Sequence, residues 1–263
     1  MPLAVSSDAC GSNHLKKGGN SLNVYGKTDT GRIRESNQDS FICGRLTENT
    51  LFCVVCDGMG GANGGNVASS MAVKIISDRI IDVYREELAD NSLKNMLESA
   101  IAAANINIYD TSMTDENLHG MGTTAVAAVV VDRKLHIVHV GDSRAYLVGQ
   151  GEIKQITRDH SVVQAMVEKG QLTQNEARNH PRKHFITRAL GVEDSVDCDY
   201  NRFIIDDKQN LLICTDGLTN LLEIDIIEKA VNEQEDKADV PQRLIHLANM
   251  AGGSDNITVV IVA

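Results

Sequence analysis

The chain has 263 residues, a formal net charge of −11 and 42% hydrophobic residues. This length and apolar content suit a single domain with a substantial core, whereas the acidic charge argues against a duplex nucleic-acid partner, which requires a basic surface. The longest apolar run, residues 125–131, is far shorter than the roughly 20 residues that span a bilayer. We therefore expect a cytoplasmic protein with no membrane span and no nucleic-acid partner.

The N-terminal 20 residues are rich in Gly, Ser and Asn and lack the basic region and apolar stretch of a secretory signal. We interpret residues 1–20 as a flexible lead-in and expect residues 21–263 to form one domain. The six cysteines do not have the spacing of a zinc site, since Cys53 and Cys56 should point to opposite faces of a strand. We expect buried thiols in a reducing compartment.

Hydrophobic periodicity predicts the elements in chain order. Three short strands are expected at residues 22–28, 38–43 and 51–57, and two long helices follow, over residues 65–88 and from Ser92 onward. Alternating apolar residues then predict a four-stranded antiparallel meander at residues 123–131, 134–140, 144–149 and 152–156. The remaining expected elements are helices at 161–169 and 173–179, strands at 202–205 and 211–215, helices at 224–231 and 240–250, and a strand from Ile257. Antiparallel strands in two blocks, each followed by helices, predict an α+β fold with two packed sheets and helices outside.

Four aspartates stand at the ends of these strand-like runs. Asp57, Asp142 and Asp216 each close a run, and Asp255 precedes the last one. An aspartate at such a position can simply make a turn. Four carboxylates at one rim, however, would repel each other unless protons or cations neutralised them, so we favour a site for hard divalent ions.

A glycine-rich segment, residues 57–65, lies between a predicted strand and a predicted helix. It lacks the Lys-Ser/Thr ending of a phosphate-binding loop, and Asn63 stands where a dinucleotide fingerprint requires glycine. Without side chains the backbone can approach an ion closely, so the Gly58 carbonyl is a candidate ligand.

Eight segments resemble, in order, the motifs of the metal-dependent protein phosphatase family, the protein phosphatase 2C type, in its compact bacterial branch. They are residues 28–39, 56–61, 122–124, 140–144, 157–160, 186–191, 214–218 and 253–257. Each motif alone is weak, but eight in one order are specific. The resemblance implies a four-layer α-β-β-α sandwich, with two central antiparallel sheets flanked by helix pairs.

The resemblance also implies a site with two Mn²⁺ or Mg²⁺ ions and a looser third one. The core ligands that it implies are Asp57, the Gly58 carbonyl, Asp216 and Asp255. Asp142 matches a ligand of the third ion, Asp39 a residue that holds metal-bound waters, and Arg34 the arginine that binds phosphate. Two such ions about 3.5–4 Å apart can activate a bridging water for direct attack on phosphorus. The implied activity is hydrolysis of phosphoserine and phosphothreonine in proteins, reversing a serine/threonine kinase in signalling.

Two residues depart from the family pattern. Met59 stands where many eukaryotic relatives have a histidine that is thought to protonate the leaving group, and Gln38 replaces an acidic residue of many members. Because serine is a poor leaving group, another proton donor is expected: His160, His180, His184 or a metal-bound water.

Residues 162–184 match the position of the family's flap beside the site. Their mixed charge indicates no particular substrate, and an ordinary helical hairpin is an equal alternative. Three functions therefore stay open: a general phosphoprotein phosphatase, a specialised relative that acts on one regulatory phosphoprotein or on a small phosphometabolite, and a non-catalytic binding module. The complete set of aspartates and Arg34 argues against the last.

Overall fold

Two antiparallel sheets form the centre of the computed structural model, which describes residues 9–11 and 22–263. The first sheet has the order β1 (Ala9–Gly11), β2 (Val24–Asp29), β12 (Ile257–Val262), β11 (Asn210–Cys214), β8 (Arg144–Gly149), β9 (Glu152–Gln155). The second has the order β10 (Asp199–Ile204), β7 (Lys134–Val140), β6 (Ala125–Val131), β4 (Thr50–Met59), β3 (Asp39–Thr47), and β5 (Gly122–Thr123) pairs with the end of β4.

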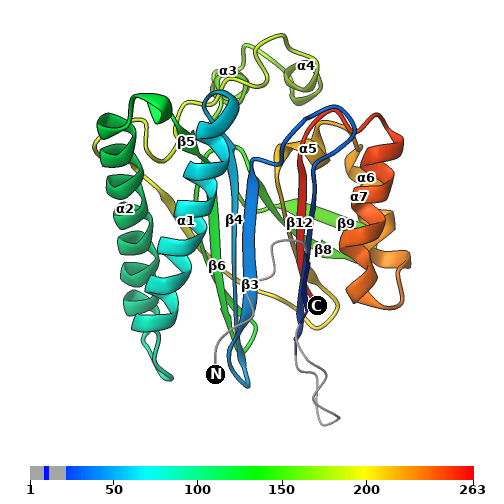
Figure 1. Cartoon of the computed structure of the whole chain (residues 1–263). Helices are drawn as coiled ribbons and strands as arrows, with labels where there is room; N and C mark the ends of the chain where they lie inside the picture. The colour runs from blue at the N-terminus through cyan, green and yellow to red at the C-terminus, as the bar shows by residue number, and fades with distance from the viewer. Residues whose placement is uncertain (1–8, 12–21) are drawn as a thin grey trace.

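Helices cover the outer face of each sheet, so the molecule has four layers (Figure 1). The second sheet carries α1 (Gly61–Val83) and α2 (Asp90–Thr114), and the first carries α6 (Ile224–Glu233) and α7 (Val240–Met250). Three short helices, α3 (Val162–Glu168), α4 (Gln174–Arg178) and α5 (Asp216–Thr219), lie toward one end of the sandwich, and 3₁₀ turns occupy Glu116–Leu118 and Lys237–Asp239. The predicted four-layer α+β fold is confirmed. No helix in the described part of the chain is long and apolar enough to cross a membrane.

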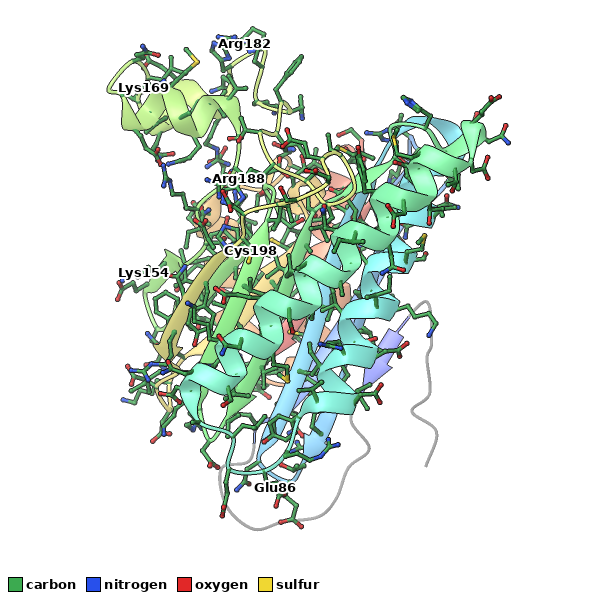
Figure 2. All side chains as sticks on the ribbon, turned by 90° about the vertical axis from the view of Figure 1, so that its left-hand side faces the viewer. Glu86, Lys154, Lys169, Arg182, Arg188 and Cys198 are labelled. Atoms are coloured by element: carbon green, nitrogen blue, oxygen red, sulfur yellow. The ribbon has the colours of Figure 1, made fainter. Side chains whose placement is uncertain are left out.

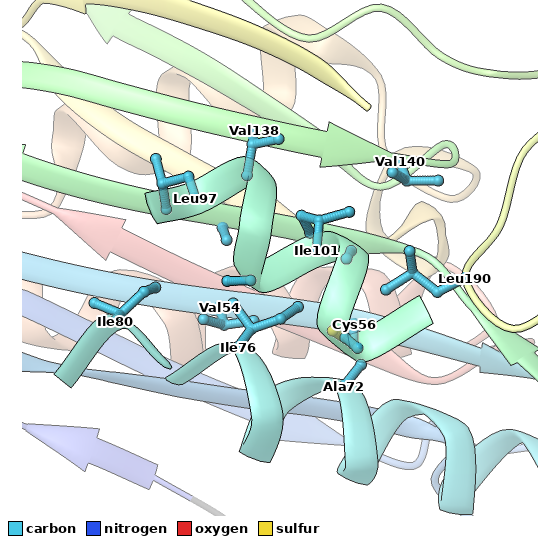
Figure 3. Packing of buried hydrophobic residues seen from close by; sticks show 14 of the residues in the cluster. Val54, Cys56, Ala72, Ile76, Ile80, Leu97, Ile101, Val138, Val140 and Leu190 are labelled. Atoms are coloured by element: carbon cyan, nitrogen blue, oxygen red, sulfur yellow. The ribbon is translucent and has the colours of Figure 1, made fainter. Parts of the chain in front are cut away.

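Three apolar clusters fill the spaces between the layers. Strand β4 shows how the alternation of its side chains serves two of them: Val54 and Cys56 face the helices, whereas Cys53 and Val55 face the other sheet. Figure 3 shows Val54 next to Ile76 of α1, with Leu97 and Ile101 of α2 in the same cluster. The predicted opposite orientation of the two cysteines is therefore confirmed, and both are buried in core layers.

The predicted four-stranded meander is wrong in its pairing, although its strand limits are close. Strand β7 pairs with β6 and β10, whereas β8 pairs with β9 and β11 in the other sheet. The chain changes sheet in the short link after β7, where Gly141 has φ 102°, a conformation that favours glycine. Alternation identifies a strand, but it does not identify the partner of that strand.

Other differences concern the limits of elements and one helix that was not predicted. Strand β10 spans Asp199–Ile204 rather than residues 202–205, and β3 extends to Thr47 rather than residue 43. Helix α1 begins at Gly61 rather than residue 65 and ends at Val83 rather than residue 88. Within the added turn Gly64 packs closely on Met121, since a Cβ on Gly64 would lie only 3.0 Å from that of Met121. Helix α5 was not predicted, since four residues are too short for a helical period. Of the expected lead-in, residues 1–8 and 12–20 lie outside the described residues, and Ala9–Gly11 pair with β2.

Candidate active site

One cavity of about 710 Å³ gathers the predicted site residues, apart from Asp39, at an edge where the two sheets meet. In one sheet, Asp57 lies near the end of β4, and Asp142 follows the end of β7. In the other sheet, Asp216 follows the end of β11, and Asp255 precedes the start of β12. Arg34, from the loop before β3, lines the same cavity. Residues far apart in the chain therefore converge because both sheets end at one place.

Strand β4 is held firmly where it enters the cavity. The backbone N–H of Asp57 donates to Thr124 Oγ1 (3.0 Å), and its carbonyl accepts from the Thr123 hydroxyl (2.8 Å). At Gly58, which also lines the cavity, a Cβ would lie 1.9 Å from the Gly65 carbonyl oxygen, so no side chain fits. The turn from strand to helix thus requires glycine at position 58, which leaves bare backbone next to Asp57.

Asp39 lies buried behind the cavity, opposite Asp57 in the pairing of β3 with β4. Its Oδ2 accepts hydrogen bonds from the hydroxyls of Thr215 (2.9 Å) and Thr258 (2.7 Å), whereas the buried Oδ1 has no partner among the described residues. Burial raises the pKa of Asp39 from 3.8 to about 7 in spite of the two threonine hydroxyls. An acceptor left in this state suits a bound water or cation.

The carboxylates in the cavity strongly disfavour each other's charge. Burial, and then the charges of Asp39 and Asp216, raise the pKa of Asp57 well above its usual range. Burial and the charge of Asp216 do the same for Asp142, and burial with the charge of Asp255 raises the pKa of Asp216. Such a group stays ionised at neutral pH only with compensating positive charge, and an all-oxygen donor set fits Mg²⁺ or Mn²⁺.

Asp216 is held in place by the short helix α5, which it begins. Its Oδ2 accepts from Asn220 Nδ2 (2.8 Å), one turn later in the chain. The next residue, Gly217, packs against β12 so closely that a Cβ would lie 1.9 Å from the Asn256 carbonyl oxygen. This contact brings the end of β11 beside Asp255, so that both aspartates reach the same cavity.

Arg34 forms a two-pronged ion pair with Asp255. Its Nε lies 2.9 Å from Oδ1, and its Nη2 donates to Oδ2 at 3.0 Å. The expected phosphate-binding arginine therefore contacts an expected metal ligand directly. Because the arginine side chain is 52% exposed and the aspartate 30%, solvent weakens the pair, and the fork can be redirected at low cost.

Asn256 is a site residue that the sequence analysis missed. Its Nδ2 donates to the carbonyls of Thr30 (2.9 Å) and Ser36 (3.0 Å), and its Oδ1 accepts from the Gln38 backbone N–H (2.8 Å). One amide thus holds the loop that carries Arg34 against the start of β12. The available signal was its place directly after Asp255 in the last motif, since a buried Asn requires several partners.

The three candidate histidines separate clearly. His184 lines the cavity, whereas His180 and His160 do not. His160 is buried, and that burial, followed by the charges of His139 and Arg188, lowers its pKa to about 4. It is therefore neutral at physiological pH and cannot donate as an imidazolium. Of the three, only His184 has direct access to the cavity.

His160 instead belongs to a cluster with His139 and Asp199 whose candidate ligand atoms lie within 4.8 Å of one another. The cluster does not suit a metal, because the Gly141 backbone N–H already donates to His160 Nδ1 (3.1 Å), and a neutral imidazole has a single lone pair. Asp199 is also paired with Arg188 (3.0 Å). The cluster holds the turn that precedes Asp142. Sequence reasoning missed both His139 and Asp199, which no motif marks.

The segment beside the site, residues 162–184, projects from the body of the molecule, as Lys169 and Arg182 show in Figure 2. Its base is closed by hydrogen bonds from the Val162 N–H to the Phe185 carbonyl (2.8 Å) and from the Thr187 N–H to the His160 carbonyl (2.7 Å). We call this segment the flap. Its fixed base places His184 at the cavity, while α3 and α4 stand away from the sheets.

Comparisons with known proteins agree with this geometry. The profile of the family described as "Protein phosphatase 2C" matches residues 31–253. The serine/threonine phosphatase stp of Listeria monocytogenes is 39% identical over 242 residues, which cover 90% of this chain and 93% of that protein. Among solved structures, Stp1 from Staphylococcus aureus has a TM-score of 0.87 at 32% identity, covering 95% of this chain and 98% of that one.

A further solved structure bears on the metal. The catalytic domain of the serine/threonine protein phosphatase PstP in complex with two manganese ions has a TM-score of 0.76 at 32% identity, with 92% of this chain and 97% of that chain covered.

The family profile spans well over half of the residues, and the Listeria relative exceeds 30% identity over nearly the whole length. The chain therefore belongs to the protein phosphatase 2C family of enzymes, as the order of its motifs predicted.

Proposed function

We propose that this enzyme is a metal-dependent phosphoprotein phosphatase that hydrolyses phosphoserine and phosphothreonine and so opposes a serine/threonine kinase in the cytoplasm. The observation that carries the proposal is the convergence, in one cavity, of Arg34 with Asp57, Asp142, Asp216 and Asp255. Such a set combines a grip for a phosphoryl group with sites for divalent cations. The names of the bacterial relatives support the substrate class.

The residues present fit two Mn²⁺ or Mg²⁺ ions held by Asp57, the Gly58 carbonyl, Asp216 and Asp255. Asp142 would share a third ion with Asp216. When bound, such ions supply an activated water for in-line attack on phosphorus and neutralise charge in the transition state. The unpaired Oδ1 of Asp39 would accept a hydrogen bond from a water at the back of the cavity.

Two side chains of the protein would contribute to the reaction besides the metal ligands. Arg34 would turn its fork from Asp255 to two phosphoryl oxygens, which matches the planar geometry of guanidinium. His184, at the base of the flap, would donate a proton to the departing serine or threonine oxygen, the role that Met59 cannot fill.

The proposal is tested with an aryl phosphate and a panel of phosphopeptides, assayed with added Mn²⁺, with chelator and after Asp216→Asn. We expect turnover of both substrate types with Mn²⁺. Turnover should fall at least about 100-fold in chelator, which removes the ions, and in the variant, which removes a core ligand. Asp110→Asn, an exposed change on α2, is the matched control and should behave as wild type.

Two results would contradict the proposal. Unchanged turnover in chelator or in Asp216→Asn would eliminate the metal mechanism. Hydrolysis of a free phosphometabolite far faster than of every phosphopeptide would replace the protein substrate with a small molecule.

A further inference from the structure

A second cavity of about 320 Å³ adjoins the catalytic one, and no role has yet been assigned to it. Met59 and Ile186 line both spaces, so the two cavities are immediate neighbours. The second cavity lies between the end of β4 and the segment that follows the flap, on the side of the molecule where Figure 2 labels Arg188.

The floor of this cavity is apolar. A Cβ on Gly122 would lie 2.9 Å from Met59 Cε and 3.0 Å from Val192 Cγ2, so the missing side chain lets these two residues converge over the backbone. Val192 is nevertheless 50% exposed, and the apolar Val196 lines the cavity beside it. The space therefore offers an aliphatic surface that no described part of the chain covers.

The rim of the cavity is acidic. Glu193 and Asp197 line it, both are exposed, and neither forms an ion pair with any described residue. Arg188 is the single cationic residue among those that line the cavity, and its guanidinium is already engaged by Asp199 at 3.0 Å. Two carboxylates without an ion-pair partner among the described residues thus line a cavity with an aliphatic floor, which shares Met59 and Ile186 with the cavity that holds Arg34.

We propose that this second cavity binds a lysine or arginine side chain of the substrate, close in sequence to the phosphorylated residue; the inference rests on the phosphatase function proposed above. The aliphatic stem would lie over Met59 and Val192 while the cationic head reaches Glu193 and Asp197. An acidic neighbour would face two like charges, and a purely apolar one would leave both carboxylates without a partner. The protein's net charge of −11 also attracts basic substrate segments rather than acidic ones.

The experiment uses a set of phosphoserine peptides that differ only by one lysine, placed in turn at each position around the phosphoserine of a neutral background. We measure kcat/KM with Mn²⁺ for the wild type and for the double variant Glu193→Gln/Asp197→Asn. The wild type should favour lysine at one or two positions by about two- to tenfold, as expected for two partly exposed ion pairs. The lysine-free peptide is the internal reference, and the double variant should lose the preference.

Asp194→Asn is the matched control, because Asp194 lies in the same acidic segment but does not line the cavity. It changes the net charge of the segment in the same direction as each test substitution and should keep the lysine preference. The wild-type preference should also shrink as salt is raised, since exposed charges are screened.

The outcomes separate the two proposals. Hydrolysis of the aryl phosphate without hydrolysis of any phosphopeptide would overturn the protein-phosphatase function itself. Efficient peptide hydrolysis with no advantage for lysine, with an advantage for glutamate, or with a lysine preference that survives in the double variant would overturn the cavity's role alone.

Discussion

At the scale of single residues, the properties of the site depend on which polar atoms still lack a hydrogen-bond or ion-pair partner. Asp39 Oδ1 and the exposed carboxylates of the second cavity have no protein partner in the described structure, while Asp255 is paired with Arg34 and also accepts the Asn256 backbone N–H (2.9 Å). Likewise, His160 Nδ1 already accepts a backbone N–H and His160 does not line the cavity, whereas His184 does. The chemistry of each residue thus follows from its hydrogen-bond inventory.

His184→Gln tests the assignment of the proton donor. An aryl leaving group is stable as a phenolate and needs no proton, whereas a serine alkoxide does. We expect kcat to fall about 100-fold for a phosphoserine peptide and by a much smaller factor for an aryl phosphate. His180→Gln, in the same flap but outside the cavity, is the control. Equal losses on the two substrates would assign His184 to binding rather than to proton transfer.

At the scale of elements, the loop of residues 30–38 depends on the start of β12 for its position. Asn256 makes three of the hydrogen bonds that hold this loop against the residues leading into β12, and the Arg32 N–H adds another by donating to the Gly253 carbonyl (2.7 Å). The first motif and the last motif are thus held together beside Arg34. The residues that lead into β12 thereby help to position Arg34, which belongs to a distant loop.

Asn256→Ala should separate these two elements. Removing the amide leaves two carbonyls and one N–H without partners, so we expect a loss of about 1–3 kcal/mol in the free energy of unfolding, measured in urea. Because Arg34 loses its anchor, KM for a phosphopeptide should also rise several-fold. Asn107→Ala, on an exposed face of α2, is the control. A loss of stability with KM unchanged would show that the loop positions itself.

The elements also show how far the sequence could predict this structure. Strand β7 was predicted with its observed limits, because buried alternation is a local property. The assignment of β7 and β8 to different sheets was not, since it depends on a turn at Gly141 and on distant partners. For the site, the motifs led to the aspartates and Arg34, which the structure places together, whereas Asn256 has a role only through contacts with residues over 200 positions earlier.

At the scale of the whole molecule, the two sheets bring the carboxylates of Asp57, Asp142, Asp216 and Asp255 together at one end of the sandwich. The three apolar clusters between the layers stabilise the fold, and the acidic end opposes it whenever its charges are uncompensated. Divalent ions would then act as part of the structure as well as part of the chemistry.

The stability of the chelated protein should therefore depend on pH. The pKa of Asp39 is raised from 3.8 to about 7, so the folded state binds this proton more tightly than the unfolded state. Its stabilising contribution is complete below about pH 4 and is lost as pH rises through 7, on the order of 2–4 kcal/mol. We expect the Tm in chelator to fall between pH 5 and pH 8, and Mn²⁺ to restore it most at pH 8. A Tm that rises over this range would contradict the assignment.

The ion pair between Arg34 and Asp255 has a consequence for how a divalent ion and inorganic phosphate would bind to the proposed site. Because Arg34 contacts both carboxylate oxygens of Asp255, an ion bound to this carboxylate would weaken its hold on the guanidinium, and a phosphate bound to the guanidinium would free the carboxylate. Each ligand thereby prepares the site for the other. By thermodynamic reciprocity, inorganic phosphate should bind more tightly as Mn²⁺ rises, and Mn²⁺ more tightly as phosphate accumulates.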